Sequence, residues 1–388
     1  MRAWAQINLN HIEHNIHYIR NIVAPKTKIM AVVKADAYGH GSIPVSRVLL
    51  ENGADMLAVT TIDEALELRD AGFDVPILIL SPVFDDAISR AVANNITLTV
   101  FDLATAQQIS EAAALAGRTA KLHIKLDTGM SRVGFPCTEN STENRAIAEE
   151  IAQIATLPHI NVEGIFTHFA KADEADRSFT DLQFSRFSAM CSLLEEMGIH
   201  IPIHHVCNSA ATIKFPEYHL DMVRCGIILY GSAPSDEMEG MADIRPVMDF
   251  KARVSNVKIV PEGTALSYGG TYVAPAKQKI ATISVGYADG YSRILSNRAQ
   301  VIINGQKAPI AGNVCMDQCM AEVSHIPDIK IGDEVILFGN SGNTTITVES
   351  VAFLKGTISY EVLCAVGKRV PRVYIQNGES VNSRNVLV

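Results

Sequence analysis

The residue best suited to covalent chemistry in this sequence is a lysine that directly follows an apolar segment. Lys34 comes after the run IMAVV, so its amine is expected at the mouth of a buried strand. Burial disfavours the charged ammonium and lowers the pKa of a lysine, which makes the amine a usable nucleophile or base. A lysine at a strand end is equally often a structural ion-pair partner, so its position alone leaves both interpretations open.

Further ionisable or strongly polar residues stand near the ends of other apolar segments in the first 230 residues. In parallel α/β barrels the carboxyl ends of the strands meet on one face, and that face carries the active site. Each of these side chains alone is most simply a solvated or ion-paired group, but their joint placement predicts a functional site. They are Lys125, Asp127, Arg132, His168, Asn208, Ser209 and Arg224.

Two segments have the features of a phosphate site. Asn208 and Ser209 can cap a helix that follows them, and Gly226 lets the backbone approach an anion closely. Barrels of this kind often bind phosphate after their seventh and eighth strands. A phosphate-bearing cofactor and an activated lysine together point to pyridoxal phosphate held as a Schiff base. A sugar-phosphate aldolase would show the same two features, so both hypotheses stay open here.

The elements that must position these residues alternate between short apolar segments and stretches with apolar residues at helical spacing. Eight such strand–helix units predict a (β/α)8 barrel of the triosephosphate isomerase type. A doubly wound open sheet is the second interpretation, but no GxGxxG follows the first strand. The predicted strands are residues 28–34, 56–60, 76–80, 96–100, 121–126, 162–169, 201–206 and 222–230.

The pattern changes to antiparallel β after about residue 236. Runs such as MDFKARVSNVKIV alternate with Gly, Asn and Pro turns, and Asn304–Gly305 is a strong hairpin signal. The polar segment 232–246 is the candidate junction. We therefore predict an α/β barrel domain over residues 1–235 and an antiparallel β domain over 236–388. Residues 1–9 alternate like a strand and are compatible with pairing to the second domain.

Composition and charge exclude several classes of protein. The chain has 33 basic and 42 acidic residues and a formal net charge of −9, which disfavours binding to nucleic acid or membrane surfaces. It has no 18-residue apolar run, and its first residues lack the apolar core of a signal peptide. We expect a cytoplasmic protein with reduced cysteines. Cys315 and Cys319 have no second Cys/His pair, so no metal site is predicted.

Segments throughout the chain closely resemble the alanine racemase family. In the first part they are AVVKADAYGHG, LHIKLDTGMSRVG, THFAKAD, NSAAT and DMVRCGIILYG, and in the second LSYGGTY, ISVGYADGY, AGNVCMDQ and KRVPRVY. The resemblance implies a fold-type III pyridoxal phosphate enzyme that interconverts L- and D-alanine, supplying D-alanine for cell-wall synthesis or degrading it. It also implies a head-to-tail homodimer with shared active sites.

The resemblance also implies a role for each matching residue. Lys34 would hold the cofactor and act as one base, and Tyr268 of the partner subunit would be the opposite base. Racemisation needs a base on each face of the α-carbon, and these two residues lie in different domains. By the same resemblance, Arg224 would contact the pyridine nitrogen, with His168 linking it to Tyr268 and His205 supporting it. The implied phosphate-binding residues are Tyr38, Ser209, Gly226, Ile227 and Tyr374, with Asn208 close by. The implied substrate-binding residues are Arg132, Tyr287, Met316 and Asp317, with Lys125 as a carbamylated lysine that orients Arg132.

Two departures and three alternatives accompany this interpretation. Ser131 replaces a glycine of the usual DTGMGR motif, and Asp36 stands where many relatives have asparagine. A fold-type III amino-acid decarboxylase and a broad-specificity racemase are the alternative enzymes. A decarboxylase profits from an acidic partner at the pyridine nitrogen, so Arg224 favours the racemase. A pyridoxal phosphate carrier is disfavoured, because such proteins resemble lone barrels.

Overall fold

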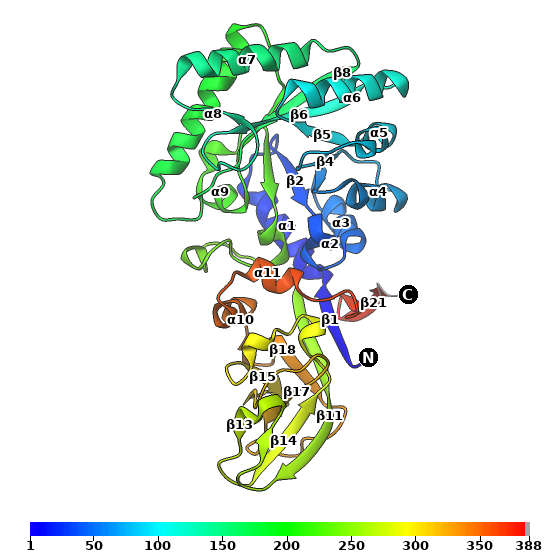
Figure 1. The fold of residues 1–388 in the computed structure, drawn as a ribbon, viewed down its shortest axis with the longest axis vertical. Coiled ribbons are helices and arrows are strands. Elements are labelled where there is room, and N and C mark those ends of the chain that lie inside the picture. Colours follow the sequence, from blue (N-terminus) through cyan, green and yellow to red (C-terminus); the bar gives the residue numbers. More distant parts are fainter. Residues whose placement is uncertain (385–388) are drawn as a thin grey trace.

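The computed structural model describes residues 1–384 and shows an elongated molecule with two parts (Figure 1). A barrel of parallel strands surrounded by helices occupies the upper half of the view, and a β-rich part occupies the lower half. One continuous set of buried apolar side chains extends from the barrel into the β-rich part. The two parts therefore share a core.

Eight parallel strands of the described chain form the barrel, in the order β10-β2-β3-β4-β5-β6-β8-β9. The ring is nearly closed between β9 and β10, where the amide of Arg224 donates to the carbonyl of Cys207 at 3.0 Å. Most strand residues are buried, as expected for parallel strands that are covered on both faces. The predicted barrel is thus confirmed. Its strands are β2 (Lys28–Val32), β3 (Met56–Val59), β4 (Ile77–Ile79), β5 (Thr97–Val100), β6 (Ala120–Asp127), β8 (Ile160–Phe166), β9 (Ile203–His205) and β10 (Met222–Cys225).

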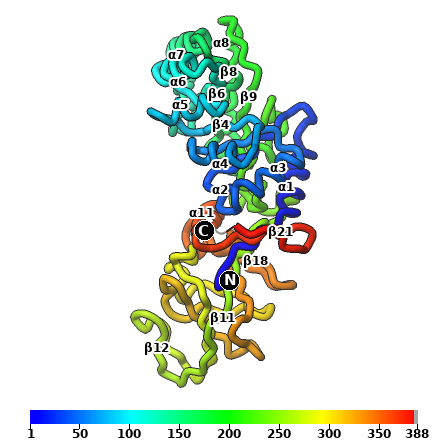
Figure 2. The backbone as a smooth tube through the Cα atoms, turned by 90° about the vertical axis from the view of Figure 1, so that its right-hand side faces the viewer, coloured from blue at the N-terminus to red at the C-terminus, as the bar shows by residue number. Residues whose placement is uncertain are grey.

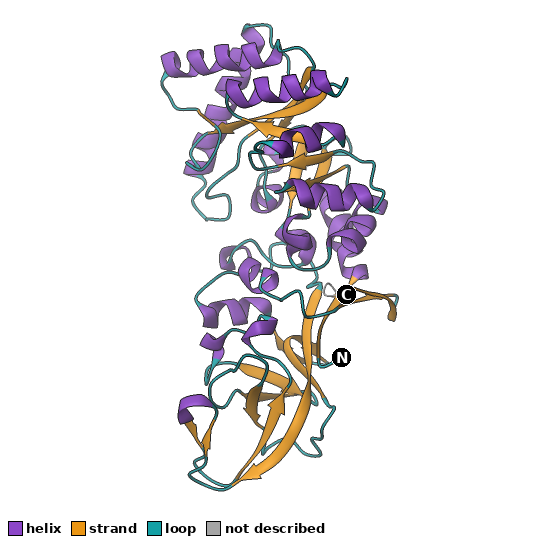
Figure 3. Cartoon of the chain, turned by 45° about the vertical axis from the view of Figure 1, so that its right-hand side comes forward, coloured by secondary structure: helices purple, strands orange, loops and turns teal. Residues whose placement is uncertain are grey.

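Helices surround these strands (Figure 3). Several begin at the capping residues that the sequence offers; Asn208, for example, accepts a hydrogen bond from the amide of Ala211 at 3.0 Å. No helix in residues 1–384 combines the length and apolar character needed to cross a membrane. The helices are α1 (Leu9–Ile22), α2 (Lys34–Tyr38), α3 (Ser42–Glu51), α4 (Ile62–Asp70), α5 (Asp86–Ala93), α6 (Leu103–Leu115), α7 (Ser141–Ala155), α8 (Ser178–Glu196) and α9 (Ser209–Lys214).

The β-rich part is built around the long strand β11 (Met248–Val260), which pairs antiparallel with β1 (Ala3–Asn8), β14 and β18. The N-terminal strand therefore lies in this sheet, between β11 and β20, and its pairing with β20 is parallel. Asn304 and Gly305 form the predicted hairpin turn between β15 and β16. Two short strands, β12 (Ala265–Leu266) and β13 (Tyr272–Val273), pair with each other, and in the barrel the short strand β7 (Phe135–Pro136) pairs with β6. The remaining strands of the β-rich part are β14 (Gln278–Ile283), β15 (Gln300–Ile303), β16 (Gln306–Pro309), β17 (Cys319–Glu322), β18 (Glu334–Ser341), β19 (Thr344–Ile346), β20 (Arg372–Gln376) and β21 (Glu379–Arg384).

Two helices in the second part differ from the prediction of β structure alone. The segment 344–350 is a strand only up to Ile346, because Thr347 then caps helix α10 (Val348–Lys355) by accepting from the amide of Ser350 at 3.1 Å. Gly356 ends this helix with a φ of 71°, and α11 (Ser359–Cys364) follows. These two helices lie between the sheet and the barrel in Figure 1, where they face the site described next.

Candidate functional site

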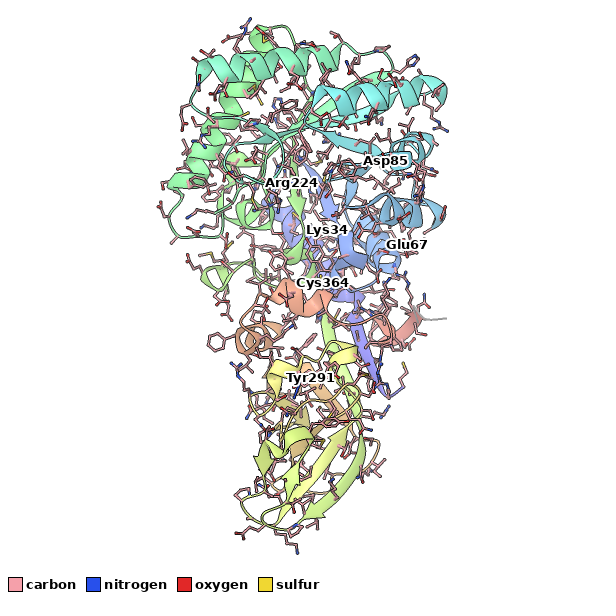
Figure 4. All side chains as sticks on the ribbon, in the orientation of Figure 1. Lys34, Glu67, Asp85, Arg224, Tyr291 and Cys364 are labelled. Carbon is pink, nitrogen blue, oxygen red and sulfur yellow. The ribbon has the colours of Figure 1, made fainter. Side chains whose placement is uncertain are left out.

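A cavity of about 1500 Å³ lies where the carboxyl ends of the barrel strands face α10 and α11. Figure 4 labels Lys34 in this region, with Arg224 on the barrel side and Cys364 on the helix side. Many of the polar residues predicted from strand ends therefore do converge on one face of the barrel. The predicted site residues that line the cavity are Lys34, Tyr38, Lys125, Arg132, His168, Asn208, Ser209, Arg224, Gly226 and Ile227.

Lys34 follows β2 and begins a turn of unusual backbone conformation. The four residues from Ala35 to Tyr38 all have φ of 53–54°, so the turn is left-handed. This conformation costs about 1–2 kcal/mol for each L-residue, so the surroundings must hold it in place. Burial lowers the pKa of Lys34, nearby Arg132 lowers it further, and Glu64 opposes these effects. Lys34 therefore has more neutral amine near neutral pH than a solvated lysine.

Arg224 is almost completely buried and is satisfied without a carboxylate partner. Its guanidinium donates to the carbonyl oxygens of Thr167, His205 and Val206 at 2.8–3.0 Å. It also lies 3.1 Å from Nδ1 of His205 and 3.2 Å from Nδ1 of His168. Burial, together with neighbouring Arg224, lowers the pKa of His168 well below its ordinary value, and burial similarly lowers that of His205. Both imidazoles are therefore neutral and can accept from the guanidinium.

Two further basic residues, Lys125 and Arg132, line the same cavity as Arg224. The amine of Lys125 is buried and lies 4.7 Å from the centre of the Phe166 ring. Burial lowers the pKa of this lysine well below its ordinary value, and repulsion from Arg224 and Arg132 lowers it further. Asp127 shapes the loop that carries Arg132, because its carboxylate accepts from the amides of Ser131 and Arg132 at 2.9 Å each. This part of the cavity is suited to bind a carboxylate.

Ser131 occupies a position where the backbone favours glycine. Its φ is 55°, in the left-handed region that a glycine enters without steric cost. The substitution relative to the usual motif therefore adds local strain, although the amide of Ser131 keeps its hydrogen bond to Asp127.

Hydroxyl groups and the backbone of Gly226 line another part of the cavity. The amide of Gly226 donates to Oγ of Ser209 at 2.9 Å, and Tyr38 and Tyr360 place their rings 6.0 Å apart between centroids. A Cβ atom on Gly226 would lie 2.6 Å from the hydroxyl of Tyr38, so only glycine leaves this space open. Such a concave set of hydroxyls and amides fits a phosphate group.

Tyr374 is a correction to the predicted phosphate site. It lies on β20, is fully buried, and is absent from the cavity lining. Its hydroxyl instead packs against Gly41, where a Cβ atom would approach it to 1.9 Å. Tyr360 of α11 lines the cavity in its place. Sequence reasoning missed Tyr360, because the segment around it was not expected to be a helix that faces the barrel.

Besides Tyr374, four predicted site residues do not line the cavity of their own chain. Tyr268, Tyr287 and Met316 are 74%, 43% and 53% exposed on the β-rich part, and the side chain of Asp317 is 55% exposed. They are nevertheless close to one another, because the segment 313–317 contacts both tyrosines. The amide of Tyr287 donates to the carbonyl of Cys315 at 3.0 Å, and Asn313 donates to the carbonyl of Tyr268 at 2.7 Å. We call the set Tyr268, Tyr287, Met316 and Asp317 the tyrosine patch.

A buried carboxylate fixes the loops of the tyrosine patch. Asp289 accepts from Arg2 at 2.5 Å, from Arg369 at 2.8 Å and from the amide of Gly286 at 2.9 Å. Arg369 also pairs with Asp317. The patch is thus an ordered surface, although it lies outside the cavity.

The chain is a parallel barrel joined to a β-rich part, and the barrel mouth holds a partly buried lysine, a buried guanidinium and a pocket of hydroxyl groups beside a glycine. These features are typical of the fold-type III class of pyridoxal phosphate enzymes. Comparison with known proteins identifies the family within that class. Residues 7–234 match the model of the alanine racemase N-terminal domain, and residues 247–374 match that of the C-terminal domain. The chain belongs to the alanine racemase family.

Individual relatives agree with this assignment. The chain is 50% identical to alanine racemase of Desulforamulus reducens over 96% of this chain and 98% of the relative. It is 42% identical to the solved alanine racemase of Clostridium difficile, with a TM-score of 0.95 over 100% and 99% of the two chains. It is also similar to alanine racemase from Bartonella henselae with covalently bound pyridoxal phosphate, at 28% identity and a TM-score of 0.86 over 97% and 100%. The decarboxylase and broad-specificity alternatives are not favoured.

Proposed function

We propose that this chain interconverts L- and D-alanine with pyridoxal phosphate, holding the cofactor on Lys34. The observation that carries the proposal is the partly buried Lys34, which shares a cavity with Arg224 in a barrel that matches the family model. Circular dichroism of L-alanine solutions incubated with the purified protein tests the reaction. Parallel incubations with L-serine and L-lysine test its strictness, and activity confined to either of these would contradict the proposal.

The residues present fit the cofactor. Tyr38, Ser209, Tyr360 and the backbone of Gly226 and Ile227 would hold the phosphate, as the space at Gly226 supports. Arg224 would face the pyridine nitrogen, where its permanently donating guanidinium keeps the nitrogen unprotonated. When bound, the cofactor acidifies the α-hydrogen of alanine by accepting electrons into its ring.

Lys34 acts as the base on one face of the substrate. A base must be free of its proton before it can remove another, and burial together with Arg132 shifts Lys34 toward its neutral form. Arg132 would bind the substrate carboxylate. Burial and the neighbouring arginines favour the neutral amine of Lys125, which is the form that carbamylation requires, and the carbamate would place a negative charge close to Arg132 and Arg224.

The base on the opposite face is assigned to Tyr268 of a second copy of this chain. The cavity of one chain contains Lys34 but not Tyr268, and the ordered tyrosine patch is exposed. A head-to-tail homodimer would bring the patch of one subunit over the cavity of the other, with Tyr287, Met316 and Asp317 closing the substrate pocket. The exposure of the patch supports this arrangement.

The remaining assignments concern organisation and location. We divide the chain into domains 1–235 and 236–388, since the last barrel strand ends at Cys225 and β11 begins at Met248, with β1 added to the second domain by its pairing. Seven free cysteines support a reducing compartment, the cytoplasm. D-alanine made there would serve as a precursor of peptidoglycan.

Replacing Gly226 with alanine is expected to weaken pyridoxal phosphate binding roughly 5- to 150-fold, since overpacking of this kind costs about 1–3 kcal/mol. The added Cβ would displace the Tyr38 hydroxyl, which it would approach to 2.6 Å. Titration of the apoprotein with the cofactor measures the effect. Pyridoxal, which lacks the phosphate, is the control ligand, and equal weakening for both ligands would contradict a phosphate site at Gly226.

Replacing Tyr268 with alanine is expected to separate the two half-reactions. If Tyr268 serves L-alanine and Lys34 serves D-alanine, exchange of the α-hydrogen of L-alanine with deuterated solvent should fall by about 10²–10⁴-fold, while exchange from D-alanine persists. Mass spectrometry of each enantiomer measures this. The neighbouring variant Tyr272→Phe, which loses only a hydrogen bond to Gln278, should leave both rates unchanged. Equal loss from both enantiomers would remove Tyr268 from the two-base assignment.

A further inference from the structure

The left-handed turn Ala35–Tyr38 links two residues with separate tasks at the proposed cofactor site. Lys34 stands at its start and Tyr38 at its end, so the conformation of the turn sets the distance between the covalent attachment point and the phosphate pocket. None of the four residues is glycine. Because L-residues disfavour this backbone region, contacts from outside must maintain the turn.

Asp36 is the point of the turn that such contacts reach. Its Oδ1 atom accepts from the amide of Ser42 at 2.7 Å and from Nη1 of Arg384 at 2.8 Å. The other terminal nitrogen of Arg384 donates to Glu67 of α4 at 2.5 Å. The guanidinium therefore bridges the turn to a barrel helix, and all three side chains are only 27–37% exposed.

Arg384 comes from the far end of the chain. It lies on β21, whose partner β20 pairs Arg372 directly opposite it. Arg372 donates to the carbonyl of Gly39 at 2.9 Å, just after the turn. Tyr374 on the same hairpin packs against Gly41. Figure 2 shows this red hairpin beside the blue segment that contains α2.

We propose that Arg384 is a positioning residue for the cofactor: by bridging Asp36 and Glu67 it holds the left-handed turn so that Lys34 and Tyr38 are preorganised for pyridoxal phosphate. The proposal rests on the proposed function for the roles of Lys34 and Tyr38. It also gives the carboxylate of Asp36 a specific task. An asparagine could still accept from Ser42, but it could not form an ion pair with Arg384.

The test compares Arg384→Gln, Asp36→Asn and the double variant with the wild-type full-length chain. Arg145→Gln is the matched control, because it removes an arginine from an exposed i,i+4 pair with Glu149 that is remote from the turn. Two quantities are measured: hydrogen–deuterium exchange of the peptide 35–42 in the apoprotein, and the dissociation constant for pyridoxal phosphate.

Arg384→Gln is expected to speed exchange of this peptide and to weaken cofactor binding by about tenfold, which corresponds to about 1.4 kcal/mol. Asp36→Asn should act in the same direction with an equal or smaller effect, because it removes only one of the two ion pairs of Arg384. The double variant should be no worse than Arg384→Gln, which already removes the ion pair with Asp36. Arg145→Gln should match the wild type. Agreement with this pattern would support the proposal.

Several results would overturn it. Unchanged exchange and affinity in Arg384→Gln would show that the turn needs no bridge. Faster exchange with unchanged affinity would show that the bridge does not position cofactor-binding residues, and equal effects of Arg145→Gln would indicate general destabilisation. Borohydride reduction of wild-type holoprotein gives a separate control. If it labels a lysine other than Lys34, the proposed function fails, whereas the exchange data still decide whether Arg384 holds the turn.

Discussion

Replacing Lys34 with alanine is expected to lower alanine racemisation by about a thousandfold or more, because general acid–base catalysis alone contributes about 10²–10⁴-fold and covalent attachment is lost as well. Lys34 is partly buried, its pKa is lowered, and it lines the same cavity as the proposed phosphate pocket. The variant should also lose the yellow colour of covalently held cofactor. Coupled detection of D-alanine and absorbance spectra measure the two effects.

The matched control is Lys26→Ala, because Lys26 is an exposed lysine just before β2. It should retain both activity and colour. Borohydride reduction of the wild type should fix the pyridoxyl group on the peptide that contains Lys34. Retention of substantial racemisation by folded Lys34→Ala protein would remove this lysine from both proposed roles.

The barrel could be predicted from the sequence because each of its strands and helices has a recognisable pattern within a short stretch of residues. Each parallel strand is buried on both faces and therefore appears as a short apolar run, such as MLAV at β3, followed by a helix. The topology then brings the strand ends together, so the sequence pattern was enough to place Lys34, His168 and Arg224 at one site. Local pattern and barrel geometry were sufficient for this half of the cavity.

The other half of the cavity depends on packing that local patterns do not encode. Tyr374 is the last residue of the motif KRVPRVY, yet on β20 its hydroxyl packs against Gly41. Tyr360 reaches the cavity only because the capping residue Thr347 and the terminating Gly356 create two helices between the sheet and the barrel. The contact of Asp36 with Arg384 joins residues 348 positions apart. Such contacts become visible only when both parts are assembled.

The surroundings of Arg224 show how the site tunes its charge. Burial lowers the pKa of Arg224 to about 10, yet that value still leaves the guanidinium charged near neutral pH. Its partners are carbonyl oxygens and neutral imidazoles, so its charge is not cancelled by a neighbouring carboxylate. In the proposed arrangement, this positive charge would face the pyridine nitrogen and would favour its unprotonated form.

Mixing two inactive variants is expected to restore activity if the active site is shared between subunits. Lys34→Ala and Tyr268→Phe each remove one base, so each homodimer has two defective sites. In a heterodimer, one site has lost both bases, while the other combines an intact Lys34 with an intact Tyr268. Complete exchange of equal amounts makes half of the dimers mixed, and we therefore expect about one quarter of wild-type activity.

This result would distinguish a shared site from one that closes within a single chain. The exposed tyrosine patch and the cavity that lacks Tyr268 both favour sharing. Native mass spectrometry must show mixed dimers before activity is compared, and unmixed variants incubated in the same way are the control. If mixed dimers form but stay inactive, each chain must supply both bases itself. The β-rich part would then have to move over its own barrel, and the exposure of Tyr268 would describe an open state of one subunit.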